Sequence, residues 1–152
     1  MQLKITTQDL VDKFWECVPH VWRQTKVHIR RNAFENYQIS EGQFQVLRRI
    51  RQGSTSVSSL AQVSGTGLPS VSKVVEALVK RGLVTRSQDP NDRRRVPLAL
   101  TPQGQQVMQE IFNEAEVWLA ARFERLDKDQ VIAFIQGLDA MNESFTDPVE
   151  NS

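Results

Sequence analysis

The chain has 152 residues, of which 39% are hydrophobic and 24% charged. This length suits one domain, and the apolar fraction is large enough for a core, so wholesale disorder is excluded. No apolar run approaches the roughly 18 residues of a membrane-spanning helix, and the first residues lack the apolar region of a signal peptide. A single cysteine excludes an internal disulfide framework. We therefore expect a soluble, cytoplasmic protein with no cofactor and no membrane partner.

The net charge of +1 conceals an uneven distribution. Residues 20–101 carry 14 Lys and Arg against 5 Asp and Glu, whereas the two flanking segments are acidic. A basic centre is expected where one face of a protein meets a polyanion such as nucleic acid. The alternative is that the charged faces are merely solvated, and charge alone does not decide between the two.

The first predicted element is a helix over residues 8–37, with an apolar stripe formed by Val18, Trp22, Thr25, Ile29 and Ala33. Pro19 lacks an amide donor, so we expect it to open the main helix and to leave residues 8–18 as a separate or kinked arm. A second helix is predicted to begin at Ser40, with Gln43 as its capping-box partner.

Two short helices and a hairpin are predicted next. Ser58 is placed to cap a helix that runs through Val63, and after a glycine-containing turn a further helix runs from about Leu68 to Arg81. Residues 83–87 and 96–100 are expected to be strands, because turn-forming Asp-Pro and Asn-Asp pairs lie between them. Pro97 requires an edge or irregular position in the second strand.

The last third of the chain is again predicted to be helical. Thr101 with Pro102 marks one helix start, and Asp127 with Gln130 marks another. A narrow seam typical of helix packing follows at steps of three and four, and consists of Val131, Phe134, Leu138, Met141 and Phe145, with Trp118 and Phe123 on the preceding helix. This is more apolar surface than one small domain buries, so we expect a dimer interface. Packing within the monomer is the alternative.

Two short helices joined by a tight turn, followed by a hairpin with a basic tip, form a winged helix-turn-helix. The second helix of such a pair fits the major groove of duplex DNA. Arg93, Arg94 and Arg95 at the hairpin tip are placed to enter the neighbouring minor groove. The alternative is a protein-interaction module, although three consecutive arginines at an exposed tip argue against it.

Three motifs stand at the spacing of one known family: KRGLV at residues 80–84, DPNDRR at 89–94 and LTPQG at 100–104. Over at least residues 40–104 the chain resembles the MarR (multiple antibiotic resistance regulator) family of transcription factors. The resemblance implies a mainly α fold with a small β-hairpin, in which a winged helix-turn-helix core is flanked by N- and C-terminal dimerisation helices.

The expected organisation is one domain over residues 1–152. Residues 8–37 and 102–146 would form the dimerisation helices, and residues 40–101 the DNA-binding lobe. The residues expected to contact DNA, from the outward face of the second helix and from the resemblance, are Ser70, Ser72, Lys73, Lys80, Asp92, Arg93, Arg94 and Arg95.

The resemblance assigns distinct roles within that set. It places Arg94 in the minor groove, with Asp92 holding the guanidinium. The chain departs from the family at Leu68 and Pro69, where a basic and a hydroxyl residue are common, and at Gly67, which replaces the usual Ser or Thr cap. Direct base readout is therefore expected to be weak relative to contacts with phosphates and through the wing.

Other candidate sites rest on fewer observations. Helical facing and the resemblance suggest an effector pocket lined by Trp22, Thr25, His28 and Phe44. Cys17 lies near the position at which peroxide-sensing members of that family carry a reactive cysteine, but an inert, partly buried thiol is the favoured interpretation. No cysteine or third histidine joins His20 and His28, so we expect no metal site. Neither a phosphate-binding loop nor a nucleophile motif is present, so we expect no enzyme.

The sequence therefore predicts a DNA-binding transcriptional regulator. In this interpretation a homodimeric repressor binds a pseudo-palindromic operator in double-stranded DNA and is released by a small-molecule or redox effector. The alternative is a winged-helix protein-interaction module or corepressor without sequence-specific DNA binding.

Overall fold

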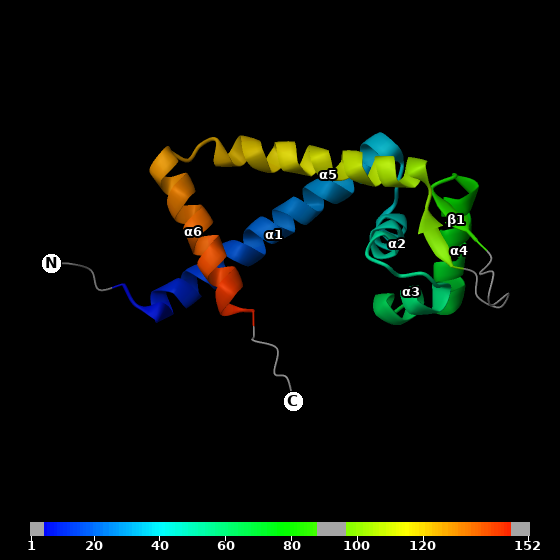
Figure 1. Cartoon of the computed structure of the whole chain (residues 1–152), viewed down its shortest axis with the longest axis horizontal. Coiled ribbons are helices and arrows are strands. Elements are labelled where there is room, and N and C mark those ends of the chain that lie inside the picture. The colour runs from blue at the N-terminus through cyan, green and yellow to red at the C-terminus, as the bar shows by residue number, and fades with distance from the viewer. Residues whose placement is uncertain (1–4, 88–96, 147–152) are drawn as a thin grey trace, which may run out of the picture. The chain divides into compact units, whose positions relative to one another are not determined.

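The computed structural model describes residues 5–87 and 97–146, and it confirms the predicted fold class, mainly α with a small β-hairpin (Figure 1). The elements are α1 (Thr7–Tyr37), α2 (Glu41–Arg51), α3 (Val57–Ser64), α4 (Leu68–Lys80), β1 (Val84–Arg86), β2 (Leu98–Leu100), α5 (Pro102–Phe123) and α6 (Lys128–Ser144). The chain divides into two compact units, Met1–Ala115 and Glu116–Ser152. Among the described residues no helix is both long and apolar enough to cross a membrane.

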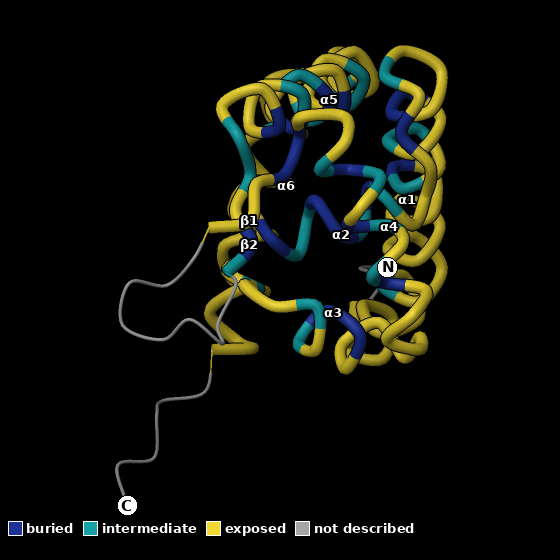
Figure 2. The backbone as a smooth tube through the Cα atoms, turned by 90° about the vertical axis from the view of Figure 1, so that its right-hand side faces the viewer, coloured by how far each residue is buried: buried dark blue, intermediate teal, exposed yellow. Residues whose placement is uncertain are grey.

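The first unit has one continuous apolar core, and Figure 2 shows buried backbone in dark blue around α2. The largest side chains in this core are less than 2% exposed, namely Ile39, Leu47, Leu60, Val75, Leu78, Val84, Met108 and Ile111. They come from α2, α3, α4, β1, α5 and the connection after α1. Because each such side chain contributes about 2 kcal/mol when it is buried, this core holds the short helices and the base of the hairpin together.

α1 is one helix, so the prediction that Pro19 opens the main helix and leaves residues 8–18 as a separate arm is wrong. Its N-cap is Thr6, whose amide donates to the Asp9 carboxylate at 2.7 Å, while the Asp9 amide donates to the Thr6 hydroxyl. This capping box starts the helix well before the proline. A proline lacks an amide donor, so the Trp15 carbonyl loses its partner, yet the 31-residue helix continues through this position without a break.

α3 begins earlier than predicted, because Ser56 and not Ser58 is its N-cap. The Ser59 amide donates to the Ser56 hydroxyl at 3.1 Å, and the Ser59 side chain reaches back to the Ser56 amide. This start turns Leu60 and Ala61 into the core. Several serines here are able to cap a helix, and burial of the apolar pair selects among them.

The two other predicted capping boxes are confirmed. At the start of α2, the Gln43 amide donates to the Ser40 hydroxyl at 3.3 Å, and the Ser40 amide donates to the Gln43 side chain at 3.0 Å. At the start of α6, the Gln130 amide donates to the Asp127 carboxylate at 2.9 Å, and the Asp127 amide donates to the Gln130 side chain at 3.0 Å. Each box satisfies two amide donors that a helix start otherwise leaves unpaired.

β1 and β2 pair antiparallel, with Val84 opposite Leu100. Each strand has three residues rather than the predicted five, and residue 96 of the second predicted strand lies outside the described residues. Pro97 precedes β2, which confirms its predicted irregular position, since it has no amide to donate to a ladder. Its carbonyl accepts a hydrogen bond from the Ser87 amide at 3.1 Å, so pairing extends one step past the strands.

The other edge of β2 is partly covered. The Leu98 amide donates to the Thr55 carbonyl at 2.9 Å, so the backbone that leads into α3 lies along β2. Residues opposite each other on antiparallel strands alternate between bonded and non-bonded pairs, which is why Leu98 turns its amide away from β1. The hairpin base is thereby tied to the helix pair that precedes it.

The start of α5 is fastened to the hairpin base. The Thr101 amide donates to the Leu83 carbonyl at 3.1 Å, and its hydroxyl donates to the Gly82 carbonyl at 2.5 Å and accepts from the Gly104 amide at 3.0 Å. A Cβ on Gly104 would lie 2.1 Å from the Leu83 carbonyl oxygen, so only glycine fits there. The LTPQG motif at residues 100–104 is therefore a junction between the hairpin and α5.

The second unit contains the end of α5 and the whole of α6. The Phe123 and Phe134 rings are 5.7 Å apart, and the Arg122 guanidinium lies 3.5 Å from the centre of the Trp118 ring. No residue of α6 is buried, and Phe134 and Leu138 are 48% and 45% exposed. The predicted seam is therefore an exposed apolar stripe.

Candidate nucleic-acid interface

α3 and α4 form the predicted helix pair and contact each other along the turn between them (Figure 1). Gly65, at φ +64°, ends α3, and Gly67 is the N-cap of α4. Gly67 provides no side-chain cap, and Pro69 suits the first turn of α4 because a missing amide donor costs nothing there. One face of α4 is buried and consists of Val71, Val75 and Leu78. The opposite face lies toward solvent.

The solvent face of α4 carries two lysines. Lys73 and Lys80 are exposed, and among the described residues no carboxylate lies within ion-pair distance of either ammonium. Ser70 is exposed, whereas Ser72 is half-buried and donates to a Glu76 carboxylate oxygen at 3.3 Å. By helical rotation the two lysines occupy the middle of this face and the two serines flank it.

Glu76 shares the same face and was not predicted as a site residue. It lies three residues after Lys73 and four before Lys80, the spacing that places side chains on one side of a helix. This spacing is visible in the sequence and could have identified Glu76 as part of the face. An exposed carboxylate between two lysines lowers non-selective attraction to phosphate, so it bears on how selectively this face binds.

Some basic residues of the central segment form hydrogen bonds or ion pairs with other residues of the chain. The Arg81 guanidinium donates to the Tyr37 carbonyl at 2.6 Å and to the Gln38 carbonyl at 2.8 Å. Gln38 is the left-handed C-cap of α1, with φ +53°, so Arg81 closes the end of that helix from the end of α4. Arg30 pairs with Glu41 at 2.7 Å. Fewer basic side chains are therefore available to contact a polyanion than the number of Lys and Arg residues in the segment suggests.

The predicted basic tip of the hairpin lies outside the described residues. This applies to Asp92, Arg93, Arg94 and Arg95, whose DNA contacts stay predictions. The described base of the hairpin adds Arg86, which is exposed at the end of β1. The hairpin directly follows α4 in the chain, and β1 contacts α4, so base and helix belong to one structural unit.

Three of the predicted effector residues have different surroundings. Thr25 is buried, and its hydroxyl donates to a backbone carbonyl of α1 at 2.9 Å. Phe44 lies in the core, with its ring 6.1 Å from that of Phe112. Trp22 is exposed, and the Lys26 ammonium lies 5.5 Å from its ring. Their common role in an effector pocket stays a prediction.

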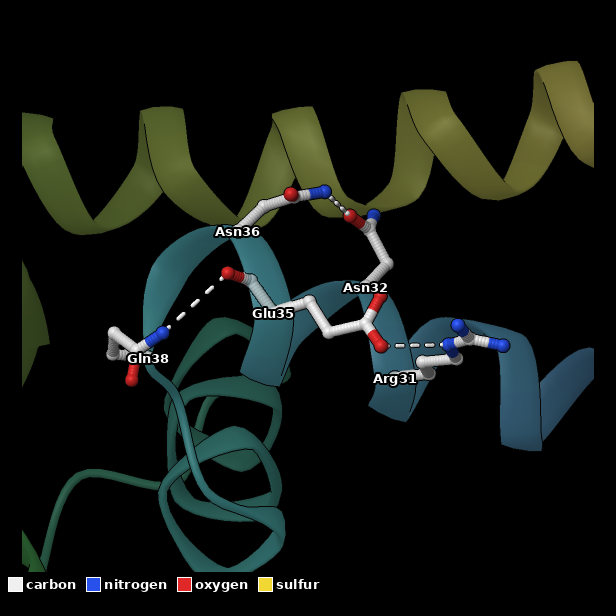
Figure 3. A network of polar contacts seen from close by, with 5 residues as sticks. All are labelled: Arg31, Asn32, Glu35, Asn36 and Gln38. Carbon is white, nitrogen blue, oxygen red and sulfur yellow. Dashed lines mark hydrogen bonds and ion pairs between the residues drawn. The ribbon is translucent and has the colours of Figure 1, made fainter.

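The fourth effector residue, His28, lines a hollow of about 240 Å³ together with polar residues of α1 and α5. Figure 3 shows the network beside it, in which the Asn36 amide donates to Asn32 at 2.5 Å and Arg31 donates to Glu35 at 2.7 Å. Asn32 also donates to the Ile111 carbonyl of α5 at 3.5 Å. The lining is thus polar and does not include Trp22, Thr25 or Phe44.

Cys17 is exposed on α1, so the expectation of a partly buried thiol is wrong. The reason is that α1 runs straight through this segment and buries no residue before Thr25. The Lys13 ammonium donates to the Glu16 carboxylate at 2.5 Å, and this hydrogen bond raises the pKa of Lys13. The redox role of Cys17 stays a prediction.

Comparisons with known proteins agree on the fold and the family. Residues 39–96 match the model of the MarR family. The multiple antibiotic resistance protein MarR of Salmonella typhimurium is 30% identical over 99 residues, which are 61% of this chain and 69% of that protein.

Two solved structures share the fold. Transcriptional regulator Tm0710 from Thermotoga maritima is 22% identical, with a TM-score of 0.80 over 88% of this chain and 94% of that one. A MepR mutant from S. aureus bound to an oligodeoxyribonucleotide is 18% identical, with a TM-score of 0.67 over 88% of this chain and 98% of that one.

Proposed function

This chain belongs to the MarR family of winged helix-turn-helix transcriptional regulators, and we propose that it is a homodimeric repressor that binds a pseudo-palindromic operator. The observation that carries the DNA contact is the exposed face of α4, with Lys73 and Lys80 at its centre. In a helix-turn-helix this second helix enters the major groove, where lysines reach guanine edges and phosphates. The MepR structure with its oligodeoxyribonucleotide supports DNA as the partner.

The homodimer is supported by exposed apolar side chains in both units. On α1 they are Leu10, Val11, Trp15, Val18, Val21 and Trp22, and on α6 they are Ile132, Phe134, Ile135, Leu138 and Met141. Rows of exposed apolar side chains of this kind mark a protein interface. A two-fold dimer presents two α4 helices, which suits half-sites about one helical turn, or roughly 34 Å, apart.

Release from DNA follows from this arrangement. The bound dimer blocks the promoter. Because the half-sites have a fixed spacing, an effector that alters the separation of the two α4 helices lowers the affinity of the dimer for DNA. The effector is either a small molecule held by Trp22, Thr25, His28 and Phe44, or an oxidant that reacts with Cys17. The protein acts in the cytoplasm, and no step requires catalysis.

The decisive experiment selects bound fragments from genomic DNA of the source organism. We expect one pseudo-palindrome to be enriched, with an affinity that falls as salt rises, at a slope of about −0.9 per phosphate neutralised. Lys73→Ala with Lys80→Ala should weaken binding, whereas Lys128→Ala, an exposed lysine at the start of α6, is the matched control. No enriched sequence, or an affinity indifferent to salt, would favour the protein-interaction module instead.

A further inference from the structure

Two exposed apolar side chains stand at the amino-terminal end of α4. Leu68, the first residue of the helix, is 54% exposed, and Pro69 beside it is also exposed. The helix packs without them, because its buried face begins at Val71 and continues through Val75 and Leu78. An exposed leucine is common on a protein surface, but here it lies on the helix that the proposed function places in the major groove.

The surroundings leave these two side chains accessible. Figures 1 and 2 show α3 at the end of the first unit that lies away from α5, and the turn into α4 follows α3 directly. Val63, on α3, is 50% exposed at the same end. Pro69 and Lys73 are four residues apart, so they are neighbours on one side of the helix. Pro69 is therefore continuous with the basic face, and Leu68 precedes it at the first position of the helix.

The chemistry of the major groove supplies one apolar partner. Its base edges offer hydrogen-bond donors and acceptors, and the only apolar group among them is the C5 methyl of thymine. The amino-terminal residues of a recognition helix are those that reach base edges. We propose that Leu68 and Pro69 contact thymine methyl groups, so that each half-site requires a 5-methylpyrimidine next to the base pair that Lys73 approaches. This inference rests on the proposed function.

The test removes the methyl group and leaves every hydrogen-bonding group in place. A duplex that carries the selected operator is compared with duplexes in which deoxyuridine replaces thymidine at one position of each half-site at a time. Burial of one methyl group is worth about fourfold in affinity, so two half-sites should lose roughly fifteenfold at the sensitive position. Equal affinity for all these duplexes would overturn the inference.

Two variants test whether α4 causes the difference in affinity between thymine and uracil duplexes. Leu68→Ala should weaken binding to the thymine operator and reduce the thymine-to-uracil difference below twofold, because the two changes remove the same contact. Val63→Ala is the matched control, since it shortens an equally exposed side chain on α3 and should keep the full difference. Equal losses from both variants would overturn the assignment to α4.

The outcomes distinguish failure of this inference from failure of the proposed function. If the chain binds its operator, with the expected salt dependence, but ignores the loss of the methyl groups, the inference fails and the proposed function stands. If the chain binds no duplex, both fail. The comparison of duplexes uses the unaltered protein, so it remains valid even if a variant does not fold.

Discussion

The two units of the chain place their apolar side chains in opposite ways. In the first unit Leu47, Leu78 and Met108 lie in the core of the chain and are fully buried, whereas Phe134 and Leu138 of α6 are about half exposed. The helices that carry these buried side chains place their apolar residues at steps of three and four, and so does α6. The comparison teaches that an amphipathic pattern shows which face of a helix needs a partner, but not whether that partner lies in the same chain.

The largest expected effect probes the close packing of the first unit. Gly104→Ala places a methyl group where the Leu83 carbonyl oxygen would be 2.1 Å away, so the junction between the hairpin and α5 must open. We expect a loss of about 3 kcal/mol in the free energy of unfolding, measured by urea denaturation. Gly42→Ala is the control, because the added Cβ of this first-turn glycine meets only Val74, at 3.9 Å.

Gly42→Ala should leave stability unchanged or raise it by up to about 1 kcal/mol, since alanine is the better helix former. If the two variants have the same stability, the tight contact at Gly104 does not limit the fold.

The next effect tests the opposite side of the comparison, the exposed stripe of α6. Phe134→Asp with Leu138→Asp puts two charges on that stripe, and we expect the dissociation constant of the dimer to rise at least a hundredfold, or about 2.8 kcal/mol. Light scattering and sedimentation measure it. Gln136→Asp with Ala140→Asp adds the same charges at the same spacing on the other side of α6 and should leave the dimer intact. If the Phe134→Asp, Leu138→Asp variant still forms a dimer with unchanged affinity, the interface lies elsewhere.

A third prediction sharpens the contrast between positioned and diffuse charge. Arg94→Ala should lower DNA affinity by about 2 kcal/mol, because it removes a contact to the narrow, negative minor groove. Asp92→Ala should lower it too, although it removes a negative charge, since the carboxylate orients the arginine. Simple electrostatics predicts the opposite sign for Asp92. Tighter binding by Asp92→Ala in a fluorescence titration would show that the wing acts only as a basic patch.

The smallest effect separates two adjacent basic residues of the first unit. Arg81→Ala removes hydrogen bonds to two carbonyls at the end of α1 and should destabilise the fold by about 1 kcal/mol. Lys80→Ala removes no described contact and should leave the melting temperature unchanged while it weakens DNA binding. Thermal denaturation and a DNA titration on both variants measure the pair of effects. The idea fails if the two variants behave alike in both assays.

Features that depend on neighbouring residues were predicted well. The capping boxes at Ser40 and Asp127 were recognised because donor and acceptor lie three residues apart in the chain. The basic face of α4 was recognised for the same reason, since helical rotation alone brings Lys73 and Lys80 together. Ser56 was missed because Ser58 is an equally good cap locally, and only the burial of Leu60 decides between them.

Features that depend on distant partners were not predictable. Arg81 counts as one more basic residue in the sequence, yet its partners lie more than 40 positions earlier in the chain, at backbone carbonyls that any residue supplies. Pro19 carries a strong local signal against helix, but the long helix tolerates the loss of one bond.

The hydrogen bond from the Leu98 amide to the Thr55 carbonyl has a consequence for behaviour at high protein concentration. Unpaired strand edges are templates on which the strands of other molecules add, and this is a common route to aggregation. Here β2 has three residues, and the amide that it turns outward at Leu98 is already engaged. We therefore expect concentrated solutions to associate through helical surfaces and not through growth of the sheet.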